Sequence, residues 1–147
     1  TTHDPEGMIT DRQEAIMPNA RQIRDTIDAQ FVGVIEQVPP MHAAIKVGGK
    51  KLYELARKGL TVERASRTVT IHTIDITAYN PPCLTLRIHC GSGTYIRALA
   101  RDLGEALKTG AYCASLRRAK IGSFDVRDAV DIHEITSDNW EDLTSDR

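Results

Sequence analysis

The chain has 147 residues, of which 41% are hydrophobic, 27% charged and 5% aromatic, and its net charge is −1. This composition predicts one soluble domain with a largely aliphatic core, and neither a membrane span nor a signal peptide. Cys83, Cys90 and Cys113 lack the C-x-x-C spacing of zinc and redox sites, and no two histidines stand four residues apart. We therefore expect buried, reduced thiols, a cytoplasmic location and no metal ion.

The first half of the chain alternates between helical and extended patterns. Ala20, Ile23, Ile27 and Phe31 form an apolar stripe at helical spacing, and Asn19 precedes them as a helix N-cap. The predicted elements, in chain order, are a helix over 19–31, a strand over 31–38 that Pro39-Pro40 ends, an extended segment over 43–47, a turn at Gly48-Gly49 and a short helix over 51–58 that Gly59 ends.

Two alternating segments follow, and they predict an antiparallel hairpin. Arg67 to Tyr79 alternates between apolar and polar residues, with one slip near His72-Thr73 that predicts a β-bulge. Asn80-Pro81-Pro82 forms a turn, and Leu84 to Cys90 alternates again. Each strand should therefore bury one face only.

A longer helix is predicted from Thr94 to Leu107, with Gly110 as the residue that ends it. The segment 111–124 is predicted to be extended, and residues after Thr136 to be loose. Strands interrupted by isolated helices indicate an α+β fold with a mainly antiparallel sheet. The buried stripe of the long helix would consist of Ile96, Leu99, Ala100, Leu103 and Leu107.

The charges are unevenly distributed along the chain. Segments 42–58 and 108–120 are basic, whereas the segment after Phe124 is acidic. One reading is a positive face that meets a polyanion, and the other is an ordinary solvated surface with chance clustering. Charge alone leaves these two readings open.

The junction from Cys90 to Arg97 is the strongest candidate for a functional site. There a strand ends, Gly91 and Gly93 turn the chain, and a helix begins with Tyr95 and Arg97 in its first turn. A cation at a helix N-terminus is unfavourable unless an anion lies beside it. That anion is either a carboxylate from elsewhere in the fold or a phosphate bound by the glycine turn.

Other catalytic patterns are absent from the sequence. No P-loop, G-x-G-x-x-G or G-x-S-x-G pattern occurs, so nucleotide cofactors and triad hydrolysis have no support. Tyr95 has two readings, as a platform on which a base stacks or as a tyrosine at the edge of the core. Arg97 is either a functional group or a plain surface cation.

The longer motifs resemble the TruB family of tRNA pseudouridine synthases. Val38 to Gly59 resembles its Q-x-P-P-x-x-S-A-x-K-x-x-G-x-x-x-Y-x-x-A-R-x-G segment, and Cys90 to Gly104 resembles C-x-x-G-T-Y-I-R-x-L-x-x-D-L-G. Leu116-Arg117-Arg118 resembles the family's L-R-R, and Thr2 to Gly7 its T-x-D-x-x-G. The order and spacing fit over nearly the whole chain, in the bacterial form.

This resemblance implies a pseudouridine synthase-like fold and the isomerisation of a uridine in the tRNA T-arm, position 55, without metal or organic cofactor. The uridine is flipped out of its stack, and an aspartate attacks the nucleotide. The resemblance implies that Arg97 pairs with that aspartate, that Tyr95 contacts the uracil and that Leu116 lines the pocket. The resemblance also implies that six further residues help to hold the site and the RNA: Lys46, Lys50, Lys51, Tyr53, Arg117 and Arg118.

The family's aspartate lies in a G-x-L-D-P-x-A-x-G segment that this sequence does not contain. Asp4-Pro5 is also an Asp-Pro pair, but it fits the later T-x-D-x-x-G segment better, and Asp102 is expected to be structural. We therefore expect part of a catalytic domain over 1–135 and an acidic, loose tail over 136–147, inactive alone and prone to self-association. A non-catalytic RNA-binding module is the alternative, and an enzyme acting on a phosphate ligand is a weaker one.

Overall fold

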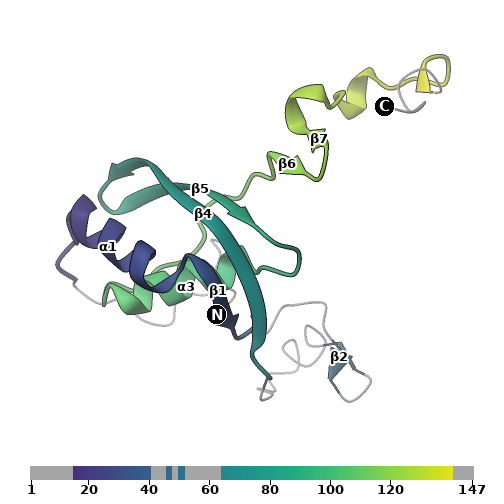
Figure 1. Cartoon of the computed structure of the whole chain (residues 1–147). Helices are drawn as coiled ribbons and strands as arrows, with labels where there is room; N and C mark the ends of the chain where they lie inside the picture. The colour runs from purple at the N-terminus through teal and green to yellow at the C-terminus, as the bar shows by residue number, and fades with distance from the viewer. Residues whose placement is uncertain (1–14, 41–45, 48–49, 52–63, 141–147) are drawn as a thin grey trace. The chain divides into compact units, whose positions relative to one another are not determined.

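The computed structural model describes residues 15–40, 46–47, 50–51 and 64–140. The chain divides into two compact units, Thr1–Ser115 and Leu116–Arg147. The first unit holds α1 (Ala20–Gln30), β1 (Gly33–Gln37), β2 (Lys46–Val47), β3 (Lys50–Lys51), β4 (Arg67–Asn80), β5 (Cys83–Cys90) and α3 (Ile96–Ala106), as Figure 1 shows. The second holds β6 (Lys120–Ile121), β7 (Phe124–Asp125) and two 3-10 turns, Val126–Asp128 and Ile132–Glu134.

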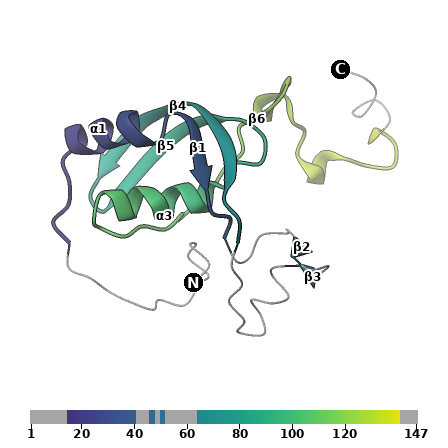
Figure 2. The same cartoon turned by 60° about the horizontal axis from the view of Figure 1, so that its bottom comes forward.

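An antiparallel sheet in the order β1-β4-β5 organises the first unit. Helices α1 and α3 lie against the same face of this sheet (Figure 2). The fold is therefore α+β with antiparallel pairing, as the sequence predicts. The described core between helices and sheet consists of Ile23, Ile27, Phe31, Ile71, Ile74, Leu99 and Leu103.

Helix α1 forms where its apolar stripe predicts it. The Asn19 side chain accepts a hydrogen bond from the Gln22 N–H, and the Gln22 side chain accepts one from the Asn19 N–H, which makes a complete capping box. Ile23 and Ile27 are buried, whereas Ala20 in the first turn is exposed, contrary to the predicted stripe. Ala20 follows the N-cap directly, and its side chain is in solvent.

Strands β4 and β5 form the predicted hairpin, including its irregularity. The register shifts between Ile71 and Thr73, which confirms the predicted bulge, and shifts again between Ile76 and Ala78. At each shift β4 has one residue more than β5. Because of this extra residue, the buried side chains of β4 face the helices both before and after each bulge. Cys83, at the start of β5, is exposed rather than buried, since it follows the hairpin turn.

Helix α3 differs from its prediction at both ends. It starts at Ile96 rather than Thr94, because the Thr94 hydroxyl donates to the Gly91 carbonyl at 2.9 Å within the preceding turn. It ends at Ala106, and Lys108, with a φ of 57°, is the first left-handed residue after it. Gly110 is also left-handed, but it lies two residues beyond the place where the helical path is broken.

Two further expectations need correction, and one lies partly outside the described residues. The segment 111–124 is not continuously extended: only Lys120–Ile121 and Phe124–Asp125 pair, around Gly122 with a φ of 57°. The predicted helix over 51–58 does not begin at Lys51, which pairs with Lys46 in the β2–β3 hairpin. The rest of that helix lies outside the described residues.

Among the described residues, no helix has the length and apolar character that a membrane span requires.

Candidate functional site

The turn after β5 is fixed to the sheet by backbone hydrogen bonds. The Gly91 N–H donates to the Thr70 carbonyl of β4 at 2.8 Å, which carries the hairpin pairing one residue past the end of β5. Gly93 has a φ of 80°, a conformation that favours glycine, and it reverses the chain toward α3. The predicted junction between β5 and α3 is therefore a tight turn, whose path is fixed by the Gly91–Thr70 hydrogen bond and by the backbone conformation of Gly93.

Tyr95 is the N-cap of α3 and is half-buried. Its side chain makes no capping hydrogen bond. Both of its backbone groups instead meet the side-chain amide of Gln37 at the end of β1: Gln37 Oε1 accepts from the Tyr95 N–H at 3.0 Å, and Gln37 Nε2 donates to the Tyr95 carbonyl at 3.4 Å. Tyr95 therefore lies just before the helix, as its N-cap, rather than at the second helical position that a start at Thr94 predicts.

Arg97 is the second residue of α3 and is exposed. The first turn of α3 contains no acidic residue. The positive end of the helix dipole and the guanidinium therefore lie together, an arrangement that favours an anion at this place. Tyr95 and Arg97 are brought to one helix start, as the sequence predicts.

The first turns of α3 are also tied to the segment after β1. Arg101 donates from its guanidinium to the Val38 carbonyl at 3.3 Å and pairs with the Asp102 carboxylate at 2.6 Å. Arg64 donates to the Pro39 carbonyl at 2.9 Å. Asp102 is thus engaged with its neighbour, which agrees with the structural reading of this residue.

The predicted basic residues fall into two separate groups. Lys46 pairs with Lys51 in the β2–β3 hairpin, and Lys50 pairs with Val47 beside them. Three of the four described residues of this hairpin are therefore lysines. Tyr53 lies outside the described residues, as does Asp4.

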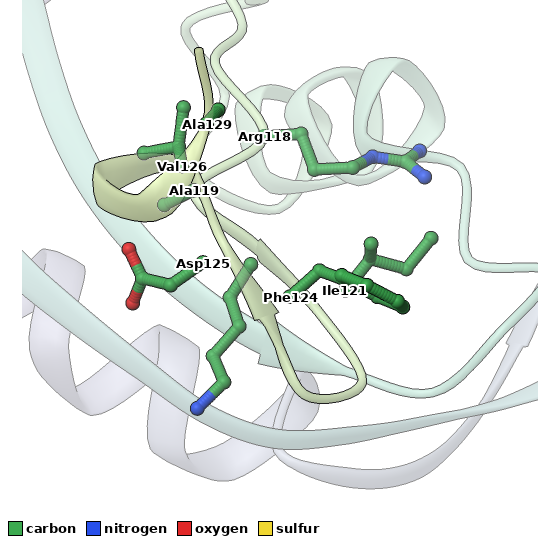
Figure 3. Close-up of a pocket in the computed structure, with 8 residues that line it drawn as sticks. Arg118, Ala119, Ile121, Phe124, Asp125, Val126 and Ala129 are labelled. Atoms are coloured by element: carbon green, nitrogen blue, oxygen red, sulfur yellow. The ribbon is translucent and has the colours of Figure 1, made fainter. Parts of the chain in front are cut away.

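Leu116, Arg117 and Arg118 belong to the second unit and precede β6. Leu116 is 63% exposed, and both arginines are exposed as well. Arg118 lines a shallow hollow of about 200 Å³ together with residues of the β6–β7 hairpin, where Ile121 and Phe124 lie side by side (Figure 3). The pocket role of Leu116 stays a prediction, because its side chain is described only within its own unit.

One carboxylate of the second unit is strongly perturbed. Asp125 accepts hydrogen bonds from the Arg127 side chain at 3.0 and 2.9 Å and from the Arg127 N–H at 3.0 Å. These bonds stabilise the charged form and lower the pKa of Asp125 to about 2, and the same carboxylate raises the pKa of Arg127. The pair closes the turn after β7, with no sign of a catalytic role.

Two protein-family models match consecutive parts of this chain. Residues 1–96 match the family described as TruB family pseudouridylate synthase, N-terminal domain. The chain belongs to the TruB family. Residues 97–146 match the tRNA pseudouridylate synthase B C-terminal domain. The border between the two TruB matches falls between Ile96 and Arg97 in the first turn of α3, whereas the compact units divide after Ser115.

Curated relatives agree with this TruB assignment. The chain is 49% identical over 140 residues to tRNA pseudouridine synthase B of Ralstonia nicotianae, covering 92% of this chain and 44% of that protein. It is 45% identical over 127 residues to the protein of the same name from Endomicrobium trichonymphae, covering 86% and 55%. For that of Haemophilus influenzae the identity is 44% over 134 residues, covering 91% and 42%. The chain thus spans about half the length of the relatives it matches, or less.

The residue that sequence reasoning missed at this site is Gln37. It is 1% exposed and holds the backbone of Tyr95. Its signal was present: Gln37 stands two residues before Pro39-Pro40, at the Q of the Q-x-P-P pattern. Arg101 was likewise noted only as part of a motif, although it links α3 to Val38.

Proposed function

We propose that this chain takes part in converting a uridine of the tRNA T-arm, at position 55, into pseudouridine. The observation that carries the proposal is the membership of the TruB family, with its motif residues Tyr95 and Arg97 at one helix start. Three relatives that match most of this chain are named tRNA pseudouridine synthase B. The whole reaction is assigned to these residues together with a nucleophilic aspartate outside the segments matched here.

In this proposal Arg97 supplies the positive charge that holds the nucleophilic aspartate ionised and in place. Its position favours that role, because the guanidinium and the α3 dipole act on an anion in the same direction. Tyr95 contacts the uracil after the nucleotide has left its stack. The half-buried residue, with its backbone bonded to Gln37, supports this contact, since these bonds fix where the Tyr95 side chain starts.

The tRNA backbone meets the basic residues outside the helix start. We assign Lys46, Lys50 and Lys51 of the β2–β3 hairpin to phosphate contacts, which the clustering of three lysines supports. Tyr53, Arg117 and Arg118 are assigned to RNA contacts as well, and Leu116 to the wall of the uracil pocket. The exposure of Leu116 leaves its side chain available for such a contact.

A second candidate function is RNA binding without chemistry. It is favoured by the basic β2–β3 hairpin, where Lys46, Lys50 and Lys51 can bind RNA phosphates whether or not turnover follows. The binding residues are then the same, and only turnover separates the two candidates.

Self-association is a further part of the proposal. In the described sheet β1 and β5 are edge strands, and Val34 on β1 is 71% exposed. Exposed strand edges with apolar side chains favour pairing with another chain. Gel filtration with light scattering should show a dimer or larger species, and a monomer at all concentrations would contradict this part.

The deciding experiment is tritium release from C5-labelled uridine in a T-arm stem-loop. The chain alone is expected to bind the RNA and to release no tritium above background. Adding the part of the Ralstonia nicotianae protein that lies outside the matched 140 residues should restore release if the two chains assemble. Release by the chain alone would place the nucleophile among its own aspartates, with Asp4 the first to replace by Asn.

A further inference from the structure

Gln37 is the single polar side chain buried in the core of the described residues. It is 1% exposed and stands at the last position of β1. A buried amide is unfavourable unless its donor and acceptor are both used. Both are used here, and both on one residue, Tyr95, 58 positions later in the chain.

The two hydrogen bonds form a pair between one side-chain amide and one backbone residue. Oε1 of Gln37 accepts from the Tyr95 N–H at 3.0 Å, while Nε2 donates to the Tyr95 carbonyl at 3.4 Å. Two bonds fix both the position and the rotation of the Tyr95 backbone, which one bond would not do. The Tyr95 carbonyl in turn accepts the first helical hydrogen bond, from the Leu99 N–H at 3.0 Å.

The other described helix shows what is unusual about this arrangement. In α1 the N-cap N–H of Asn19 donates to Gln22 Oε1 at 2.8 Å, so the helix satisfies its own start. In α3 the N-cap N–H also meets a glutamine Oε1, but that glutamine belongs to β1. The N-cap N–H of α3 is therefore satisfied by a side chain of the sheet rather than by one of its own helix.

A third hydrogen bond joins α3 to the residue that follows β1, in the second turn of the helix. Arg101 donates to the carbonyl of Val38, the residue after Gln37. The end of β1 is thus joined to the N-cap and to the second turn of α3. Arg97 lies on the helix between these two ties.

We infer that Gln37 is a positioning residue of this site: it holds the Tyr95 backbone at the helix start and so sets the direction in which the Tyr95 ring and the Arg97 side chain leave it. This role rests on the proposed function only for the claim that Tyr95 and Arg97 act on substrate. The hold on Tyr95 itself is tested without any activity.

The first test is amide hydrogen exchange on the full chain, comparing Gln37→Leu with Gln22→Leu. Both variants remove a glutamine amide from a helix N-cap, but only Gln37 bonds to Tyr95. We expect exchange of the Tyr95 amide to rise about tenfold or more in Gln37→Leu, beyond any rise in the Ile27 amide of α1, and to stay unchanged in Gln22→Leu. Unchanged exchange at Tyr95 in Gln37→Leu would overturn the inference.

The second test, Gln37→Glu, keeps the side-chain volume and covers the case in which Gln37→Leu unfolds. A protonated carboxyl offers one donor and one acceptor, like the amide, whereas the ionised form has no donor for the Tyr95 carbonyl. Burial raises the pKa of such a carboxyl. Both forms accept from the Tyr95 N–H, so the readout is the carbonyl ¹³C shift of Tyr95, which should match the parent chain at low pH and change as the carboxyl ionises and loses its donor. A carbonyl shift that is independent of pH would contradict the two-bond geometry.

The third test uses the tritium-release assay with the restored second chain. We expect Gln37→Leu to lower kcat by about tenfold or more with little change in KM, because substrate still reaches the basic residues while Tyr95 and Arg97 are misdirected. An equal loss in Gln22→Leu would show a general stability effect and overturn the assignment. If no turnover occurs in the parent assembly either, the proposed function has failed, and the exchange data alone decide the role of Gln37.

Discussion

Gly104 of α3 lies directly against Ala111, in the chain that returns after the helix. A Cβ atom at Gly104 would come within 2.6 Å of the Ala111 Cβ and closer still to the Ala111 backbone nitrogen. The carbonyl of Gly104 also accepts from the Thr109 and Gly110 N–H groups at 2.9 and 3.1 Å. The glycine that ends the D-L-G motif is therefore required by a backbone approach at the C-terminal side of α3.

Gly104→Ala should destabilise the chain despite its favourable helix propensity. Alanine in place of a helical glycine normally adds about 1 kcal/mol of stability, whereas forced overpacking against backbone costs about 1–3 kcal/mol. We expect a net loss in the free energy of unfolding, measured by urea denaturation. Gly91→Ala is the matched control, because its Cβ would meet the Thr70 carbonyl oxygen at 3.5 Å, an ordinary contact. A more stable Gly104→Ala variant would contradict the close approach.

Tyr79→Phe should lower stability through one hydrogen bond. The Tyr79 hydroxyl donates to the Pro18 carbonyl at 2.6 Å and ties β4 to the segment before α1, 61 residues away. Loss of a partly buried bond of this kind costs about 0.5–1.5 kcal/mol. Urea denaturation should show this loss, while Tyr112→Phe, at a side chain 59% exposed, should leave the unfolding midpoint nearly unchanged. Equal midpoints in both variants would show that the Pro18 bond contributes nothing.

The elements that the sequence predicts correctly are those with a strong local period. The stripe of α1, the alternation of β4 and β5 and even the bulge near His72 follow from residue patterns within single segments. The errors lie where local signals compete. Lys108 and Gly110 both follow α3 and both are left-handed, and the first left-handed residue is Lys108 rather than the glycine that the sequence indicates.

The candidate site also has residues that the sequence predicts and one that it does not. Tyr95 and Arg97 were predictable because a strand, a glycine turn and a helix start are adjacent in the sequence. Gln37 was not, because its partner is 58 residues away and the two meet only once β1 pairs with β4 and β4 with β5. A polar residue inside an apolar strand signals such a tertiary bond but does not name its partner.

The Asp125–Arg127 pair predicts a pH dependence confined to acid. Because the pKa of Asp125 is lowered from 3.8 to about 2 by hydrogen bonds from Arg127, its stabilising effect is complete above the unfolded-state pKa. That effect is lost as the pH falls from about 4 through about 2. Carbon-detected NMR titration should place the Asp125 carboxyl near 2, and Arg127→Leu should return the pKa toward 3.8.

Arg67→Leu serves as the control for that titration. It removes the same charge from the first unit and should leave the pKa of Asp125 unchanged. A pKa that moves equally in both variants would mean that net charge, rather than the hydrogen bonds from Arg127, lowers it.

The lysines of the β2–β3 hairpin predict a specific salt dependence of RNA binding. If Lys46, Lys50 and Lys51 each neutralise one phosphate, replacing all three by Gln should weaken binding of a T-arm stem-loop and lower the slope of log K against log salt by about 2–3. Fluorescence anisotropy between low and physiological salt measures that slope.

The matched pair of single variants is Lys50→Gln against Arg21→Gln, because each removes one positive charge and Arg21 is an exposed residue of α1. Lys50→Gln should lower the slope by about 1, as expected for one lost phosphate contact, while Arg21→Gln should leave it unchanged. Equal slopes in the two variants would show that the RNA senses only net charge, and the hairpin would lose its assignment as a phosphate-binding surface.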